Sequence, residues 1–178
     1  KLHISYYDKS NGDLKYASNE LGRWVSVTLD TINVGKLTSI AIDSNNKVHI
    51  IYKTETAGLR YINNVSGFWE ITTVYNDGGY VGDATSVAID GDNNMHVGFY
   101  TSQYMIYATT QGATPPNWNT TIIGNVWGGG TYSIAAAVDS TGIVHIGYIS
   151  GGVKYVNSLN WAAITTITDT NQESGNDM

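Results

Sequence analysis

Hydrophobic and polar residues alternate with a period of two along most of this chain. Val48, Ile50 and Tyr52 alternate with the residues between them, and the segment 69–74 has the same alternation. Residues such as Val, Ile, Thr, Tyr and Trp suit the pleated, half-buried surface of a β-sheet. No segment has a hydrophobic stripe of helical period over three turns. The pattern therefore predicts short β-strands throughout and no helix.

Clusters of Asp, Asn, Ser and Gly separate the alternating segments. These residue types favour turns, because they accept local backbone hydrogen bonds or tolerate a positive φ angle. Adjacent predicted strands are therefore joined by tight turns and run antiparallel. The clusters occupy positions 10–12, 43–46, 66–67, 90–94, 139–142 and 150–152.

The chain repeats itself four times. Each copy carries a histidine, then an apolar-x-Tyr triplet, then a tryptophan, and the His-to-His spacings are 46, 47 and 49 residues. A strand of small apolar residues ending in Asp precedes the last three histidines. Landmarks in constant order at a near-constant period indicate a repeat architecture. The histidines are His3, His49, His96 and His145, the tyrosines Tyr16, Tyr61, Tyr107 and Tyr155, and the tryptophans Trp24, Trp69, Trp118 and Trp161.

Each repeat has the length and the strand number of a β-propeller blade, which contains four antiparallel strands in about 40 to 50 residues. The segments of small residues at 39–43, 86–90 and 136–139 suit the crowded innermost strand. The predicted fold is therefore an all-β propeller of about four blades, the first of which lacks its innermost strand. The predicted blades are 1–34, 35–80, 81–128 and 129–168, followed by a polar tail at 169–178.

The blade period does not divide the chain length evenly, since 178 residues contain about 3.8 repeats of about 47 residues. Because propellers close by pairing strands from their two ends, three arrangements are open. The chain is an excerpt of a longer propeller, which we favour, or a four-bladed ring with one three-stranded blade. In the third arrangement, two copies form a homodimer that completes one larger propeller.

One repeat resembles those of secreted prokaryotic β-propellers that are loosely grouped with the sialidase-like, BNR-type superfamily. The resemblance rests on the run from Asp43 to Tyr52 and on the following Leu-Arg-Tyr and Gly-Phe-Trp segments, and it extends from Lys1 to about Thr168. It implies the propeller fold. The sialidase Asp-box, Ser-x-Asp-x-Gly-x-Thr-Trp, is absent from this sequence. The three arginines that clamp a sialic acid carboxylate cannot be supplied by Arg23 and Arg60 alone.

Composition narrows the functional classes. With 13% charged residues, a net charge of −6 and scattered lysines, the chain lacks the basic surface that nucleic acid requires. No apolar run is long enough to insert into a membrane. Zero cysteines exclude disulfides and thiolate metal sites. Few charges with abundant Asn, Thr, Tyr and Gly favour an extracellular or cell-surface location.

The repeated tryptophans and histidines are interpreted as structural. A residue that recurs at one place in every blade answers a packing or hydrogen-bonding demand that also recurs in every blade. A tryptophan at the start of each outermost strand would cover the groove between two blades. The histidines would be spread around the propeller, which makes them unsuitable as a shared metal site.

Departures from the repeat are better guides to a ligand site. Two predicted loops on one face of the propeller, residues 76–83 and 125–132, combine glycines with aromatic and polar residues. Further aromatic and polar residues lie in the loops between the second and third strands of the blades. Aromatic faces beside carboxylates and amides suit sugar recognition. The alternative is that Trp127 and Tyr80 only fill the mouth of the channel or the gap between blades. The candidates are Trp127, Tyr80, Tyr132, Asp77, Tyr104 and Glu55.

The segment 90–94 has oxygen ligands at alternate positions, as calcium loops do. Asp90, Asp92 and Asn94 are therefore candidate metal ligands, and calcium is the only cofactor that the sequence suggests. The alternative is a hairpin turn in which Asp90 accepts backbone N–H groups. The bidentate Glu that would complete an EF-hand loop is missing.

We predict a non-catalytic binding or adhesion module whose partner is a glycan or another surface polymer. Nucleophile–base motifs, metalloprotease motifs and P-loops are absent, so no catalytic residue is assigned. Two alternatives stay open. One is a glycoside-active enzyme, a sialidase-like hydrolase or a lyase, and the other is a structural spacer in a larger surface protein.

Overall fold

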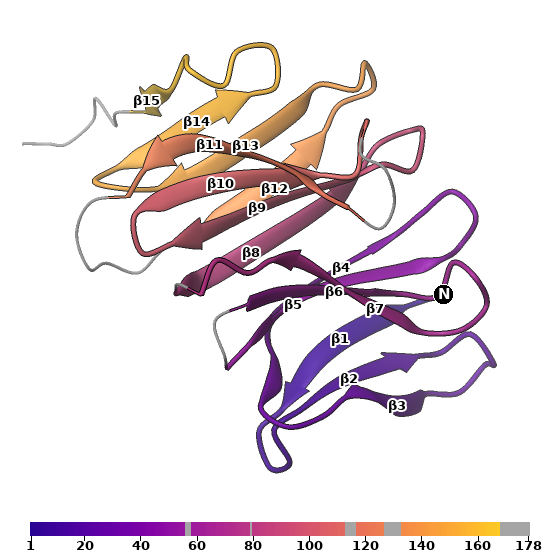
Figure 1. Cartoon of the computed structure of the whole chain (residues 1–178). Coiled ribbons are helices and arrows are strands. Elements are labelled where there is room, and N and C mark those ends of the chain that lie inside the picture. Colours follow the sequence, from indigo (N-terminus) through magenta and orange to yellow (C-terminus); the bar gives the residue numbers. More distant parts are fainter. Residues whose placement is uncertain (56–57, 79, 113–116, 127–132, 168–178) are drawn as a thin grey trace, which may run out of the picture.

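The computed structural model describes residues 1–55, 58–78, 80–112, 117–126 and 133–167, and every regular element within these ranges is a β-strand. Four antiparallel sheets follow one another along the chain (Figure 1). Each sheet is one propeller blade, so the predicted all-β propeller of about four blades is confirmed. No helix that could span a membrane is found in these ranges.

Blade 1 has three strands and each of the other blades has four. Blade 1 contains β1 (His3–Asp8), β2 (Asp13–Ser18) and β3 (Val25–Asp30), in that order across the sheet. The first blade therefore lacks an innermost strand among the described residues, as the sequence predicts. Blade 2 contains β4 (Val34–Ile42), β5 (Val48–Thr54), β6 (Gly58–Asn63) and β7 (Glu70–Tyr75).

Blades 3 and 4 repeat this meander. Blade 3 contains β8 (Val81–Ile89), β9 (Met95–Thr101), β10 (Tyr104–Thr109) and β11 (Asn119–Asn125). Blade 4 contains β12 (Ile134–Val138), β13 (Val144–Ile149), β14 (Val153–Asn157) and β15 (Thr165–Ile167). Three outermost strands begin directly after the repeat tryptophan. In blade 4, β15 starts later, because residues 157–163 form consecutive turns closed by the bonds Asn160 N–H to Asn157 O and Ala163 N–H to Asn160 O.

The turns between the first and second strands of blades 2, 3 and 4 are built alike. In each, one carboxylate oxygen of the leading Asp accepts backbone N–H groups from two and four residues further along the chain. The residue three positions after the Asp has a positive φ angle, and it is Asn46, Asn93 or Gly142. Asn and Gly are the residues that adopt this conformation most readily. The Asp-led clusters in the sequence therefore form tight hairpins.

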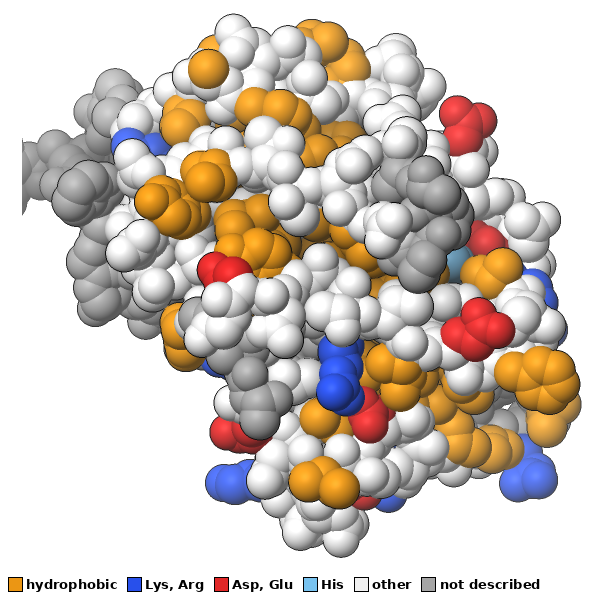
Figure 2. All heavy atoms as spheres, in the orientation of Figure 1, with side chains coloured by type: hydrophobic (Ala, Val, Ile, Leu, Met, Phe, Trp, Pro, Cys, Tyr) orange, Lys and Arg blue, Asp and Glu red, His pale blue; other side chains and the backbone are white. Residues whose placement is uncertain are grey.

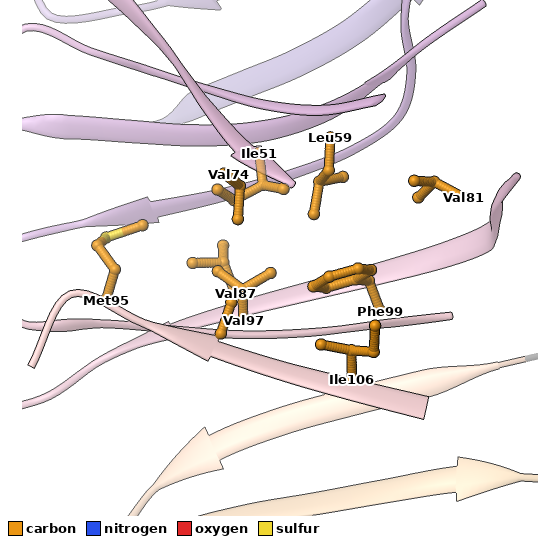
Figure 3. Close-up of a cluster of buried hydrophobic side chains, with 10 residues drawn as sticks. Ile51, Leu59, Val74, Val81, Val87, Met95, Val97, Phe99 and Ile106 are labelled. Carbon is orange, nitrogen blue, oxygen red and sulfur yellow. The ribbon is translucent and has the colours of Figure 1, made fainter. Parts of the chain in front are cut away.

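The buried hydrophobic side chains form separate clusters between neighbouring blades rather than one common core. Blades 2 and 3 enclose Leu59, Val81, Val97 and Phe99, each of them 0% exposed (Figure 3). A similar cluster lies between blades 1 and 2, and a third lies between blades 3 and 4. Blades 2 and 3 therefore have hydrophobic clusters on both faces, because each has a neighbouring blade on either side.

Charged side chains are sparse on the surface. Figure 2 shows Lys and Arg side chains one by one across the visible face, with no cluster of basic residues. On this face the charges are therefore isolated among apolar and uncharged polar groups. This kind of surface favours ligands that are recognised by hydrogen bonds and apolar contact.

Candidate functional site

The candidate site lies at the edge of the molecule formed by the loops after the second and fourth strands of the blades. We call this edge the upper rim. Two cavities meet there. The first has a volume of about 440 Å³ and lies between blades 2 and 3, where Tyr75, Asp77 and Tyr104 line it together with Ile106 and residues 120–122. The second, of about 290 Å³, is lined by Ser102, Gln103, Tyr104, Asn125 and Val126. Tyr104 lines both cavities, so the two cavities adjoin at this residue.

Backbone hydrogen bonds hold Tyr104 in place. Thr101 Oγ1 accepts the N–H of Tyr104 at 3.0 Å and donates to the Tyr104 carbonyl at 3.3 Å, which closes the turn between β9 and β10. Val126 N–H donates to the Gln103 carbonyl at 2.9 Å and ties this turn to the end of β11. Because the backbone is fixed on both sides, the half-exposed Tyr104 ring presents a defined apolar surface.

Asp77 supplies a carboxylate to the larger cavity. The Tyr75 hydroxyl donates to Asp77 Oδ2 at 2.6 Å, and the Tyr75 ring packs against Phe99 with 5.1 Å between ring centroids. Burial, together with the hydrogen bond and the charge of Asp77, raises the pKa of Tyr75 to about 12. Tyr75 therefore stays protonated at neutral pH and orients a carboxylate that is exposed to solvent.

The structure brings together two of the six residues predicted for ligand binding, Asp77 and Tyr104. Tyr80 and Glu55 instead contact lysines of blade 2. The Lys53 ammonium lies 4.2 Å from the centroid of the Tyr80 ring, and Glu55 pairs with Lys36, whose hydrogen bond and charge lower the pKa of Glu55. Trp127 and Tyr132 lie outside the described residues. A complete site of all six residues stays a prediction.

The described residues that line these two cavities offer hydrogen-bonding groups, one carboxylate and one aromatic ring. Among the described lining residues, Asp77 is the single carboxylate, whereas glycoside hydrolysis ordinarily needs two carboxyl groups on opposite sides of the scissile bond. The other polar groups are hydroxyls and the amides of Gln103 and Asn125. Such groups exchange hydrogen bonds with a hydroxylated ligand while the Tyr104 ring covers its apolar face.

A third cavity, of about 440 Å³, lies at the opposite ends of blades 2 and 3. Its polar lining includes Asn45, Asn63, Glu70 and Asn117, and Trp118 forms its apolar wall. Sequence reasoning missed this cavity because its aromatic members belong to the repeat. One signal was available: Glu70 stands where the other repeats have Val25, Asn119 and Ala162 after the tryptophan.

The repeated histidines and three of the four repeated tryptophans make structural contacts, as predicted, whereas Trp24 is 51% exposed. In all four blades the histidine Nδ1 lies 2.6 Å from the hydroxyl of the repeat tyrosine. Each of Tyr16, Tyr61 and Tyr107 also packs against the tryptophan of the following blade, with centroid distances of 5.2, 5.5 and 4.5 Å. The repeat therefore links each pair of neighbouring blades through aromatic rings.

An acidic residue contacts the other nitrogen of each histidine. His96 Nε2 lies 3.2 Å from Asp90 Oδ2, and the equivalent distance in blade 4 is 3.1 Å. In His96 and His145 the carboxylate accepts the Nε2 proton, so Nδ1 accepts the proton of the tyrosine hydroxyl. His49 is 4% exposed and lies 3.3 Å from Asp43 Oδ2.

Stability is expected to fall on the acid side of neutrality. Burial lowers the pKa of His49, and the attraction of Asp43 offsets this only in part. The unfolded chain therefore binds a proton at His49 first, and the folded state loses stability as the pH falls below about 6.5. Urea unfolding at pH 7.5, 5.5 and 4 should show this decrease. A higher unfolding free energy at pH 5.5 than at pH 7.5 would contradict the assignment.

A second acid-side loss is expected from the aspartates of the hairpins. Asp43, Asp90 and Asp139 each have a pKa below the ordinary value. Burial raises the pKa of Asp43 and Asp90, but hydrogen bonds to their carboxylates lower it by more. At Asp139, hydrogen bonds are the main cause of the lowered pKa. Their stabilisation is complete above the unfolded pKa of about 4 and is lost as the pH falls from there.

The predicted calcium ligands lie in the hairpin between β8 and β9. Asp90 Oδ1 accepts the N–H groups of Asp92 and Asn94, while Oδ2 accepts the Asn94 side-chain amide at 2.8 Å and contacts His96. This is the hairpin-turn geometry. Within the described ranges no group of three or more His, Asp or Glu side chains is placed to hold a metal ion. Calcium binding here stays a prediction.

Comparisons with known proteins give similarity in structure only. Neither a protein-family description nor a curated protein sequence matches this chain. A variant of the Aleuria aurantia lectin, in complex with Fucα1-6GlcNAc, superposes with a TM-score of 0.65 at 16% identity over 97% of this chain and 59% of the lectin. AofleA from Arthrobotrys oligospora gives 0.63 at 15% identity, over 94% of this chain and 53% of AofleA.

Two further structures extend this set. SapL1 lectin in complex with α-methyl fucoside gives a TM-score of 0.62 at 11% identity over 94% of this chain and 62% of the lectin. The intramolecular trans-sialidase of Ruminococcus gnavus gives 0.50 at 14% identity over 92% of this chain and 38% of the enzyme. At these identities the similarity shows the fold alone. The chain spans less than two thirds of the length of these proteins.

Proposed function

We propose that this chain is a carbohydrate-binding propeller module that holds its ligand at the upper rim, around Tyr104. The observation that carries the proposal is that one half-exposed tyrosine lines two adjoining cavities, with the Asp77 carboxylate in one and the Gln103 and Asn125 amides in the other. Two sugar units of a glycan can occupy the two cavities on either side of the ring.

The dimensions and the chemistry of the site support a saccharide. Cavities of about 300 to 1,000 Å³ hold small ligands, and the larger of the two lies in this range. A sugar ring presents C–H groups that pack on an aromatic face and hydroxyls that need acceptors and donors. The apolar surface comes from Tyr104 and Ile122, and the hydrogen-bonding groups come from Asp77, Thr120 and Thr121.

The similar structures suggest which sugars to test first. The Aleuria aurantia lectin and SapL1 lectin, which share the fold, are complexes with fucose-containing ligands. We therefore choose fucosides as the first probes for this chain. An extracellular or cell-surface location belongs to the same proposal, since glycan ligands are found there and the low charge of the chain suits that location.

Binding is measured by isothermal titration with methyl α-L-fucoside and by a printed glycan array. Replacing Tyr104 by alanine removes the shared ring and is expected to weaken binding by about tenfold. Asp77→Asn keeps an acceptor for the Tyr75 hydroxyl but removes the charge, and we expect a several-fold loss. Asp13→Asn, on the same rim in blade 1, and the exposed Phe68→Ala are the matched controls and should bind as the parent chain does.

The outcomes separate the function from the site. An array without any bound glycan contradicts the proposed function. Glycan binding that survives Tyr104→Ala and Asp77→Asn but is lost in Glu70→Gln supports carbohydrate binding and assigns it to the cavity at the opposite ends of blades 2 and 3. Release of a shortened glycan in the presence of the protein favours the glycoside-active alternative.

A further inference from the structure

The third cavity, between blades 2 and 3, has a lining of acidic, amide and aromatic groups. It lies at the edge formed by the loops after the first and third strands of the blades, which we call the lower rim. Its described lining contains the carboxyl groups of Asp43 and Glu70 and the rings of Tyr61 and Trp118, but no lysine or arginine. The amides come from Asn45, Asn63, Asn93 and Asn117.

Glu70 gives this cavity a charge that the repeat does not require, since the equivalent residues of the other blades are uncharged. The side chain is exposed, and the Ser66 hydroxyl donates to Glu70 Oε1 at 2.8 Å and orients the carboxylate. The lysines and arginines that form ion pairs within the described residues contact other carboxylates, those of Asp8, Asp30 and Glu55. The Glu70 charge is therefore available to a ligand.

Asp43 supplies a second negative charge from the hairpin of blade 2. Burial raises the pKa of Asp43, but the backbone N–H groups of Lys47 and Asn45 donate to its carboxylate and lower the pKa by more. Burial lowers the pKa of His49, which also lines the cavity and is therefore uncharged at neutral pH. The described lining thus carries two negative charges and no positive charge.

His49 lacks a hydrogen bond that its equivalents make. In blades 3 and 4 the leading Asp of the hairpin accepts the Nε2 proton of the histidine, at 3.2 and 3.1 Å. His49 Nε2 lies 3.3 Å from Asp43 Oδ2 outside hydrogen-bonding geometry, and this buried nitrogen has no hydrogen-bond partner in the described part of the chain. A buried polar atom without a partner is uncommon, and a bound molecule or ion beside it is one cause. This departure from the repeat falls in the lining of the cavity.

Contacts between blades 2 and 3 fix the positions of these groups. Ser44 N–H in the hairpin of blade 2 donates to Asn93 Oδ1 in the hairpin of blade 3 at 3.0 Å. Trp118 of blade 3 packs edge-on against Tyr61 of blade 2, with 5.5 Å between ring centroids and 81° between the ring planes. Tyr61 in turn stacks on His49. A preformed cavity of this kind loses less conformational freedom when a ligand binds.

We propose that the cavity at the lower rim binds a small organic cation, a molecule in which an ammonium group adjoins hydroxyl or apolar groups. Glu70 and Asp43 attract the positive charge, and aromatic rings such as that of Trp118 attract organic cations to their faces. The asparagine amides exchange hydrogen bonds with hydroxyl groups of the ligand. Its volume of about 440 Å³ lies in the range of cavities that hold small ligands.

This inference is independent of the proposed function, because the cavity at the lower rim shares no described lining residue with the two cavities at the upper rim. Within the described ranges no group of three or more His, Asp or Glu side chains is placed to hold a metal ion. An organic cation needs no such group, since carboxylates and aromatic rings attract it without direct coordination.

The first experiment compares ligands that differ in charge but hardly in shape. Glucosamine is paired with glucose, and choline is paired with its uncharged carbon analogue, in which a tert-butyl group replaces the trimethylammonium group. At about pH 6.5 the amine of glucosamine is protonated. The titrations follow the indole N–H signals of the five tryptophans by NMR, and the Trp118 signal is identified as the one missing in Trp118→Phe.

We expect the charged member of a pair to bind about tenfold more tightly than its uncharged partner and to shift the Trp118 signal. A preference within the glucosamine pair alone supports the proposal and selects amino sugars. A preference within the choline pair alone supports it and selects simple ammonium ions. Equal binding of charged and uncharged members in both pairs, or a Trp118 signal that no cation shifts, overturns the proposal.

The second experiment removes one charge from the cavity. Glu70→Gln keeps the length of the exposed side chain and an acceptor for the Ser66 hydroxyl, so the fold should be unchanged. We expect the cation that the parent chain binds to lose affinity by about tenfold. Glu20→Gln, at a carboxylate of blade 1 outside the cavity, is the matched control and should bind as the parent does. Parent-like cation binding by Glu70→Gln contradicts the proposal.

Titrations with methyl α-L-fucoside separate this site from the upper rim. Tyr104→Ala should keep the parent affinity for the cation, whatever its effect on the fucoside. A chain that binds no glycan but prefers the cations contradicts the proposed function and supports the cation site. Loss of cation binding in Tyr104→Ala, together with parent-like binding in Glu70→Gln, would place the cation at the upper rim and overturn the inference.

Discussion

Phe99→Ala is expected to lower the free energy of unfolding by about 3 to 5 kcal/mol, the usual cost of removing a large buried aromatic side chain. Phe99 is 0% exposed and lies in the cluster that joins blades 2 and 3, close to Leu59 and Val81 (Figure 3). The loss should lower the melting temperature by roughly 10 °C in a chain of this size. Chemical denaturation and calorimetry measure both quantities.

The same substitution should weaken ligand binding at the upper rim. The Tyr75 ring packs on Phe99 and its hydroxyl orients Asp77, so a cavity behind Tyr75 loosens the carboxylate. Phe68→Ala is the control, because Phe68 is 79% exposed and its loss should change stability by less than about 0.5 kcal/mol. Equal effects of the two substitutions would show that blades 2 and 3 do not depend on this contact.

The repeat made the architecture predictable from the sequence. Four landmarks recur with a constant order, and short strands with Asp-led turns leave few ways to connect them. The histidine and tryptophan of each repeat were predicted to answer a structural demand, and the Nδ1–hydroxyl distances of 2.6 Å in all four blades confirm it for the histidines. The prediction that the tryptophan covers the groove between two blades is confirmed for Trp69, Trp118 and Trp161, each of which packs on the repeat tyrosine of the preceding blade.

The candidate site was predictable only in part. Departure from the repeat selected Asp77 and Tyr104, and the structure places both in the lining of one cavity although they belong to different blades. It also selected Tyr80 and Glu55, whose lysine contacts depend on how the loops of blade 2 fold over β4 and β5. A pattern of residue types does not distinguish a carboxylate that lines a cavity from one paired with a nearby ammonium.

The exposure of Trp24 could not be predicted from its position in the repeat. Its sequence position is equivalent to that of three packed tryptophans, so the prediction of a groove-covering ring applied to it equally. Its exposed fraction is 51%, because no blade among the described residues precedes blade 1, whereas each of the other three tryptophans packs on a preceding blade. The same reasoning explains why Val153 is exposed although Leu59 and Met105 are buried.

Asp90→Ala is expected to cost about 3 kcal/mol of stability, the size of effect that follows when hydrogen bonds to a buried charged group are removed. The Asp90 carboxylate accepts two backbone N–H groups and the Asn94 amide, and it contacts His96, which is 1% exposed. Removing the carboxylate leaves these donors without their acceptor at the start of β9. Asp90→Asn keeps the Oδ1 acceptor and should cost less.

Asp92→Ala separates the two interpretations of this hairpin. Asp92 is exposed, and in the hairpin-turn interpretation only its backbone N–H takes part, so the substitution should change stability by less than about 0.5 kcal/mol. If the segment 90–94 binds calcium, added calcium raises the melting temperature of the parent chain, and Asp92→Ala removes that shift. Melting curves of the parent and the three variants, with calcium and with a chelator, give both answers. A parent chain without a calcium shift, together with a small effect of Asp92→Ala and a large effect of Asp90→Ala, assigns the carboxylate of Asp90 to the turn alone.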